Sequence, residues 1–388
     1  MVLPRSGSCS APAPAAGEAK SATRGFAAFE GVIMAGALVA AAAMFMAAAS
    51  NTYTITGKAA AAAGYPSDPT IGGRLLVAQE LAAERETAGL ERAIGLLEGV
   101  TAQAPGFAPG HAGLAEALIL SREFGARADA DAFRQARAAA MAAVRIDPDL
   151  PSGHRLLGFI SYWKDGDFAQ AQKRFERALA LDPNDVLSHF WYGNILSDRG
   201  DHGSALAELE RARTLDPGSL AIRTDLAWAQ WAAGQDAVAI PALQEIARSN
   251  PGFPVAQDCL AIIALVNGDD KGYVVHFTRF ALARQDKRLM RKAQHLAEAG
   301  PARLRRLVYE QALSDVAEGS RGRAWPVLVA SLRGDRRAVM QLLQAAEREH
   351  EVWGDAALVP RIRAVWKNDR RIAAMIDLRV GGISLASR

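Results

Sequence analysis

Residues 151–217 read PSGHRLLGFISYWKDGDFAQAQKRFERALALDPNDVLSHFWYGNILSDRGDHGSALAELERARTLDP and contain one pattern of side-chain sizes written twice. Both copies place similar residues in the same order, namely Leu157, Gly158, Ala171, Phe175, Ala178, Asp182 and Pro183 in the first and Tyr192, Gly193, Ala205, Leu209, Ala212, Asp216 and Pro217 in the second. Large residues at these spacings give each helix an apolar stripe, and the Gly and Ala positions let two antiparallel helices approach closely. Proline disfavours the helical conformation of the preceding residue, so each Asp-Pro pair marks the end of a hairpin.

This pattern resembles the tetratricopeptide repeat, whose unit of about 34 residues has small residues at its eighth and twentieth positions and a proline near its end. The resemblance implies an all-α fold, a right-handed α-solenoid of helical hairpins in which each repeat contacts only its neighbours. Enlarging Gly193 or Ala205 should therefore strain a helix crossing, whereas changes at Asp201 or Glu208 should be nearly silent.

The composition of the 388-residue chain suits helices that pack through small contacts, because half of the residues are apolar and only 7% are aromatic. The 45 basic and 42 acidic residues leave a formal charge of +3, which indicates no general affinity for nucleic acid. Cys9 and Cys259 lie on opposite sides of the strongest apolar run, and neither has the paired spacing of a zinc or redox site.

That apolar run, GVIMAGALVAAAAMFMAAAS at 31–50, has no charged residue and is long enough as a helix to cross a bilayer. We predict a disordered cytoplasmic tail at 1–25 and a transmembrane helix or signal anchor at 26–50. Basic residues precede the run, and Lys58 alone follows closely, which predicts a single-pass protein of the bacterial inner membrane with its N-terminus cytoplasmic and its repeats periplasmic. The alternative is a cleaved signal peptide, because residues 47–50 offer small side chains to a peptidase.

The rest of the chain divides into three predicted parts. A linker at 51–73 is low in complexity and contains prolines that disfavour regular structure. Helical periodicity then predicts a tetratricopeptide array of about six repeats at 74–285, followed by degenerate helical repeats and a C-terminal cap at 286–388. The second repeat is too long for the unit, and its excess at 122–131 predicts an enlarged turn between its two helices.

Motifs for catalysis are missing from the sequence. It contains no phosphate loop, serine nucleophile elbow or glycine-rich dinucleotide turn. No two of its seven histidines have the i, i+4 spacing that would place both on one metal ion. We therefore predict that the chain is not an enzyme and has no cofactor or metal.

The resemblance also implies a binding surface, because the first helices of tetratricopeptide hairpins line a concave groove. Carried onto this sequence, the groove-facing positions include Arg155, Phe159, Tyr162, Phe190, Trp191, Asn194, Trp228 and Trp231, with Trp163, Asp198 and Asp225 beside them. This strip suits a protein or peptide partner, since flat rings bury a large area and Asn and Arg can hydrogen-bond a peptide backbone. For each ring the alternative is a place in the core between repeats.

Three functions fit these features. The first is a membrane-anchored periplasmic scaffold that gathers protein partners through the aromatic groove. The second is the sensory part of an envelope signalling system, and the third is an accessory subunit of an enzyme encoded elsewhere. Each is compatible with a monomer or an oligomer.

Overall fold

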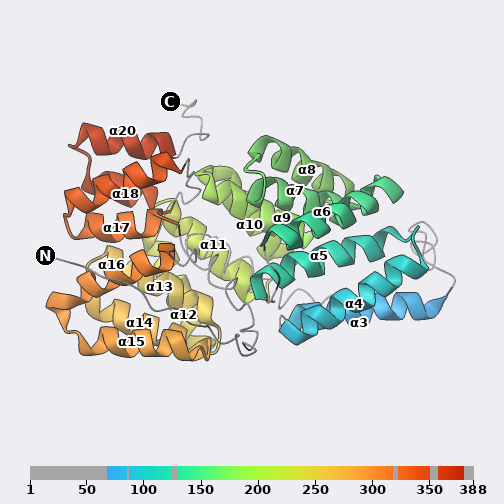
Figure 1. Cartoon of the computed structure of the whole chain (residues 1–388), viewed down its shortest axis with the longest axis horizontal. Coiled ribbons are helices and arrows are strands. Elements are labelled where there is room, and N and C mark those ends of the chain that lie inside the picture. The colour runs from blue at the N-terminus through green and yellow to red at the C-terminus, as the bar shows by residue number, and fades with distance from the viewer. Residues whose placement is uncertain are drawn as a thin grey trace, which may run out of the picture.

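The computed structural model describes residues 68–84, 87–124, 127, 129–317, 322–349 and 357–379. Within these ranges the regular structure consists of eighteen helices, α3 to α20, and no strand (Figure 1). The all-α prediction is therefore confirmed. The predicted tail, the predicted membrane helix and most of the predicted linker lie outside the described residues. Among the helices that are described, none has the length and apolar character that a bilayer span requires.

Six consecutive hairpins form the first and larger part of the structure. Their first helices are α3 (Pro69–Glu84), α5 (Ala108–Phe124), α7 (Pro151–Trp163), α9 (Val186–Asp198), α11 (Leu220–Ala232) and α13 (Pro254–Val266). Their second helices are α4 (Thr87–Gln103), α6 (Asp129–Ile146), α8 (Phe168–Leu181), α10 (His202–Leu215), α12 (Asp236–Ser249) and α14 (Asp270–Ala283). Each hairpin packs against the next one. Helix α3 begins inside the segment predicted as linker, because a proline is tolerated in the first turn of a helix.

The turn between the two helices of a hairpin repeats with the period of the array. Gly166, Gly200, Gly234 and Gly268 follow one another at 34-residue intervals, and each has a positive φ between 68° and 80°. Glycine adopts this conformation at little cost, so it ends the first helix. In three of the four turns the next residue is an aspartate that accepts a hydrogen bond from a backbone N–H of the second helix and so caps it.

The small residues of the repeat lie at the closest helix crossings, as the size pattern predicts. A Cβ added to Gly193 would lie 2.8 Å from Cγ of Leu209, and one added to Gly158 would lie 2.9 Å from the Phe175 ring. Ala205 is also completely buried. The paired helices α7–α8 and α9–α10 therefore approach as closely as they do because these positions lack larger side chains.

The second repeat accommodates its extra residues by lengthening both helices. Helix α5 runs to Phe124 and α6 begins again at Asp129, so the enlarged turn predicted at 122–131 is wrong for most of that range. A cation–π contact joins the end of α5 to the start of α6, because the guanidinium of the buried Arg122 lies 4.8 Å from the centroid of the Phe133 ring.

The stack continues with six further helices toward the C-terminus. These are α15 (Lys287–Glu298), α16 (Pro301–Ala317), α17 (Ala324–Leu332), α18 (Arg336–Arg348), α19 (Val359–Val365) and α20 (Arg370–Arg379). Helix α19 packs on α17 and α20 packs on α18, at the end of the stack (Figure 1). Buried apolar side chains form two clusters, and both include residues of α11, which joins the two parts of the structure.

First and second helices differ in how they are buried. Helix α13 is largely apolar, with Gln257 and Asp258 as its polar residues, and all but three of its thirteen residues are buried. By contrast, α8 buries only Ala171, Phe175 and Ala178, one stripe along its length. A helix that is apolar all round belongs in a core, whereas a striped helix has one face in solvent. The first helices of the central repeats thus form an inner layer that the second helices cover from outside.

Candidate functional site

The eight residues predicted to line the groove lie on three consecutive first helices, α7, α9 and α11. The structure brings several of them into direct contact. The rings of Phe159 and Trp191 lie 5.1 Å apart between centroids, and the Arg155 guanidinium is 5.4 Å from the Trp191 ring. Trp228 and Trp231 form a second contact at 4.7 Å. The register inferred from the repeat therefore places these side chains together.

Most of this strip is packed between helices and does not face solvent. Six of the eight residues are buried, with no more than 6% of each exposed, and these are Arg155, Phe159, Phe190, Trp191, Trp228 and Trp231. Tyr162 and Asn194 are half-buried. The expectation of an open aromatic surface is thus wrong for the six buried residues, because the five rings pack into the hydrophobic core and Arg155 is paired with Asp185 beside them. The role of Tyr162 and Asn194 in partner binding stays a prediction.

Polar side chains connect successive inner helices beside these rings. Arg155 donates to Asp185 at 2.5 Å and lies 3.5 Å from Glu116 of α5. Burial raises the pKa of the Asp185 carboxyl, but the Arg155 charge and the Ser188 hydroxyl outweigh it, so the pKa lies below its usual value. Asp185 is therefore ionised at neutral pH and holds Arg155 in place.

A second polar pair joins α9 to α11. The Asn194 side-chain amide donates to Asp225 at 2.7 Å, and the other carboxyl oxygen of Asp225 is buried without a hydrogen-bond partner. Burial raises the pKa of Asp225 well above its usual value, with the Asn194 hydrogen bond opposing this shift. Burial also raises the pKa of the Cys259 thiol on α13, and the acidic side chains of Asp258 and Asp225 reinforce this shift. Cys259 is therefore a protonated, buried thiol.

The C-terminal helices return to the repeat array at one point. Arg361 of α19 donates a 2.8 Å hydrogen bond to the carbonyl of Trp231, and its guanidinium lies 3.9 Å from the centroid of that ring. It also lies 3.6 Å from Asp236 at the start of α12. Trp231, predicted to face a partner, thus contacts a residue 130 positions later in the same chain. Sequence reasoning missed this contact, since no local pattern marks it.

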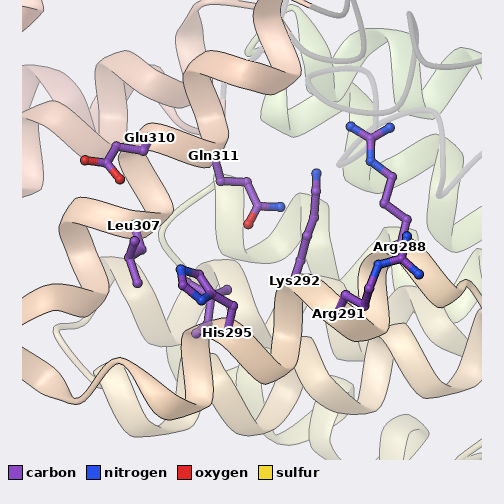
Figure 2. Close-up of a pocket in the computed structure, with 8 residues that line it drawn as sticks. Arg288, Arg291, Lys292, His295, Leu307, Glu310 and Gln311 are labelled. Atoms are coloured by element: carbon purple, nitrogen blue, oxygen red, sulfur yellow. The ribbon is translucent and has the colours of Figure 1, made fainter.

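A cavity of about 360 Å³ opens between α15 and α16 (Figure 2). Helix α15 contributes Arg288, Arg291, Lys292, His295 and Leu296, and α16 contributes Leu307, Glu310 and Gln311. None of the residues predicted from the sequence lies there. The basic residues of α15 recur at helical spacing, and this spacing is the signal that could have found the cavity. Across the described ranges, no group of three or more His, Cys, Asp or Glu side chains is placed to hold a metal ion.

Comparison with known families decides what kind of array this is. Two models of the tetratricopeptide repeat match the sequence, one over residues 156–220 and the other over residues 196–263. The chain is a tetratricopeptide-repeat protein. The matched residues run from α7 into α13 and include the rings of the strip and the Asn194–Asp225 pair, and they begin one residue after Arg155. The cavity between α15 and α16 lies beyond the matched residues of this tetratricopeptide-repeat protein.

Solved structures similar to this tetratricopeptide-repeat protein share little sequence with it. PilW, a type IV pilus biogenesis factor, is 17% identical, with 62% of this chain and 92% of that chain covered and a TM-score of 0.41. PilF of Pseudomonas aeruginosa is 16% identical over 62% of this chain and 90% of that chain, with a TM-score of 0.39. The human IFIT1 dimer with m7Gppp-AAAA is 17% identical over 80% and 72%, with a TM-score of 0.49. The curated proteins contain no significant match.

Proposed function

We propose that this tetratricopeptide-repeat protein is a membrane-anchored scaffold of the bacterial envelope that binds a protein or peptide partner. The repeat array carries the proposal, because arrays of this family indicate scaffolds for protein–protein interaction. We also propose that the array is right-handed. The proposed membrane anchor and periplasmic location rest on the uncharged run at 31–50 and on the basic residues that precede it. Enzymatic activity is no part of the proposal.

The partner surface is proposed at the C-terminal ends of α7 and α9, where the predicted groove residues reach the surface. Trp163 and Tyr162 are both half-buried, and their rings meet edge to face at 4.9 Å. The side-chain amide nitrogen of Asn194 donates a hydrogen bond to Asp225, and the amide oxygen has no hydrogen-bond partner among the described residues. A half-buried indole on α7 and an acceptor oxygen on the neighbouring α9 suit a peptide whose backbone N–H groups are available.

Co-purification of the full chain from membranes tests the proposal. Trp191 is unsuited as a probe, because truncating a buried tryptophan costs about 3–5 kcal/mol of folding stability. Trp163→Ala should instead lower partner recovery about tenfold, as expected for an aromatic anchor at an interface. Lys173→Ala, on the exposed face of α8, is the control. Equal recovery with both variants, at unchanged helix content, would exclude this surface.

The topology is tested separately from the partner. A reporter that is active only outside the cytoplasm, fused after residue 388, should be active, and the same reporter fused before residue 1 should be inactive. Mass spectrometry of the mature chain distinguishes the two N-terminal hypotheses, because an anchor leaves residues 31–50 in the protein and a signal peptide does not. An inactive C-terminal fusion would contradict the proposed location.

A further inference from the structure

The cavity between α15 and α16 concentrates positive charge on one side. Arg288, Arg291, Lys292 and His295 stand on the face of α15 that lines it (Figure 2). Their spacing of three or four residues keeps them on one helix face, as in any helix with 3.6 residues per turn. Helix α16 adds one acidic side chain, Glu310, together with Leu307 and Gln311.

Part of this charge has no internal counterion. Lys292 is paired with Asp315 at 2.9 Å, and the Glu310 carboxylate accepts a 2.7 Å hydrogen bond from Arg306 on the same helix. Arg291 and His295, in contrast, are exposed and have no hydrogen bond or ion pair within the described part of the chain. The Glu310 carboxylate is therefore already paired with Arg306, which lies outside the cavity. Arg291 faces solvent, and no carboxylate within the described residues neutralises its charge.

Two arginines on other outer helices are paired. Arg177 lies 2.5 Å from Asp149, and Arg213 is paired with Glu210 one turn before it. Each of these cations faces a carboxylate of the same chain, so its charge is neutralised locally. The cavity differs from these two sites because its cations cluster on one helix face around an open hollow between α15 and α16, and Arg291 has no carboxylate partner within the described residues.

The walls of the cavity limit what can enter it. Leu296 is almost fully buried and Leu307 is half-buried, so they provide an apolar surface below the charged groups. Gln311 adds an amide that can both donate and accept hydrogen bonds. A volume of about 360 Å³ is at the small end of ligand pockets, which hold roughly 300–1,000 Å³. It suits a few side chains of an extended segment and excludes a whole helix.

We propose that this cavity is a second binding site, which takes an acidic peptide segment of the partner with a carboxylate on Arg291 and an aliphatic side chain on Leu296 and Leu307. Guanidinium groups bind carboxylates through paired, directed hydrogen bonds, which a screened surface charge alone does not provide. The site deepens the proposed function, because it names the chemistry by which a scaffold would select its partner.

Binding of a labelled peptide to the full chain, followed by fluorescence anisotropy, tests the site. The probe is a decapeptide of Asp, Glu and Leu, and its matched control replaces every Asp with Asn and every Glu with Gln. We expect the acidic peptide to bind and the neutral one to bind at least about tenfold more weakly, since charge-assisted bonds are lost. Equal binding of the two peptides would overturn the proposal.

Variants then locate the site. Arg291→Glu should weaken the acidic peptide at least about tenfold, and Arg291→Lys should retain part of the affinity. Gln311→Glu adds a negative charge to the cavity without removing an arginine and should also weaken binding. Arg337→Glu makes the same charge change on the exposed face of α18 and should have little effect. Equal losses at Arg291 and Arg337 would mean a general charge effect and would refute the site.

Two further probes separate acidic peptides from other anions. Inorganic phosphate should compete with the peptide only weakly, because it lacks the aliphatic contact with the two leucines, and a single-stranded RNA oligonucleotide should not bind at Arg291. Tight binding of either one with no binding of the peptide overturns the proposal. If a partner co-purifies with the chain but the acidic peptide does not bind, this site fails and the scaffold function stands. If the peptide binds but no partner co-purifies with the chain, the cavity stands as a site for acidic peptides and the proposed scaffold function fails.

Discussion

Arg361→Ala tests how the C-terminal helices close on the repeat array. The guanidinium stacks 3.9 Å from the centroid of the Trp231 ring and donates to the Trp231 carbonyl at 2.8 Å. That carbonyl belongs to the last turn of α11, where helix C=O groups lack a full set of helical partners and the helix dipole is negative. One side chain therefore caps α11, covers its tryptophan and connects it to α19.

The size of the effect follows from these contacts. A partly desolvated cation–π contact contributes about 2 kcal/mol, and a hydrogen bond from a charged group contributes about 1.5–3 kcal/mol. The ion pair with Asp236, which is half exposed, adds about 0–1 kcal/mol. Burial lowers the pKa of Arg361, against the opposing effect of Asp236, so desolvation offsets part of this gain. We expect Arg361→Ala to reduce the free energy of unfolding by about 2–3 kcal/mol.

Urea unfolding of the full chain, followed by circular dichroism, measures this loss. Arg363→Ala is the matched control, because Arg363 lies on the same helix and pairs with Asp377 in a more exposed position, where an ion pair is worth about 0–1 kcal/mol. Arg361→Lys should fall between the two, since it keeps the charge and loses the planar group that covers the ring. If Arg361→Ala is no more destabilising than Arg363→Ala, the contact does not hold the two parts of the structure together.

Three further substitutions test the packing and the buried titratable groups of the array. Gly193→Ala should cost about 1–3 kcal/mol of unfolding free energy, because the new Cβ would lie 2.8 Å from Leu209; an unchanged urea midpoint would contradict the assigned crossing. Burial lowers the pKa of His189, but its hydrogen bonds with Glu208 and the Pro183 carbonyl and the charge of Glu208 together outweigh burial and leave the pKa above its usual value. The stabilisation from this pair is therefore complete below about pH 6.5 and is lost as the pH rises, so His189→Gln should flatten the decline of melting temperature between about pH 6 and pH 9. Burial raises the pKa of Asp225 well above its usual value, so the folded chain keeps a proton that the unfolded chain releases, and stability falls as the pH rises above about 4. Asp225→Asn should remove this part of the pH dependence, and parallel stability profiles for the variant and the natural chain would show that Asp225 is not the group responsible.

The hairpins could be predicted from the sequence because their signals are local. A glycine that adopts positive φ, an aspartate that caps the next helix and an Asp-Pro pair that ends the hairpin all act within a few residues of one another. Gly166 with Asp167 and Gly200 with Asp201 do in the structure what their residue types predict. These turns recur at the repeat spacing, so the helix pairs could be placed before any coordinates.

Residue size alone was a poor guide to polar positions on the outer helices. The size pattern treats Asp201 and Glu208 as nearly silent, and that interpretation is wrong for both. Asp201 caps α10 by accepting a hydrogen bond from Ser204 at 3.2 Å, and Glu208 contacts His189 of α9 at 2.5 Å. Both contacts join parts of one repeat through polar atoms, which a pattern of large and small side chains does not represent. Loss of the cap alone costs about 1 kcal/mol.

The burial of the aromatic strip could not be read from one repeat. Whether Trp228 or Trp231 faces solvent depends on what the rest of the stack brings against it, and each hairpin adds its own small rotation to that arrangement. Arg361 of α19 reaches Trp231 of α11 only after the helices from α12 to α18 have been stacked in between. The local pattern predicts which residues of adjacent repeats are neighbours. It does not predict contacts between distant parts of the chain, such as the one between Arg361 and Trp231.

These observations favour a partner-binding site away from the centre of the array. Where the repeat register is strongest, from α7 to α13, the large side chains pack against one another and stabilise the stack. Where the register weakens, at α15 and α16, the packing leaves a cavity and an unpaired arginine, Arg291. A tight crossing requires small residues at fixed positions, so a hairpin that has lost them separates and can surround a ligand. Degeneracy of the repeat is thus the physical reason why this tetratricopeptide-repeat protein has its described cavity outside the residues that the family models match.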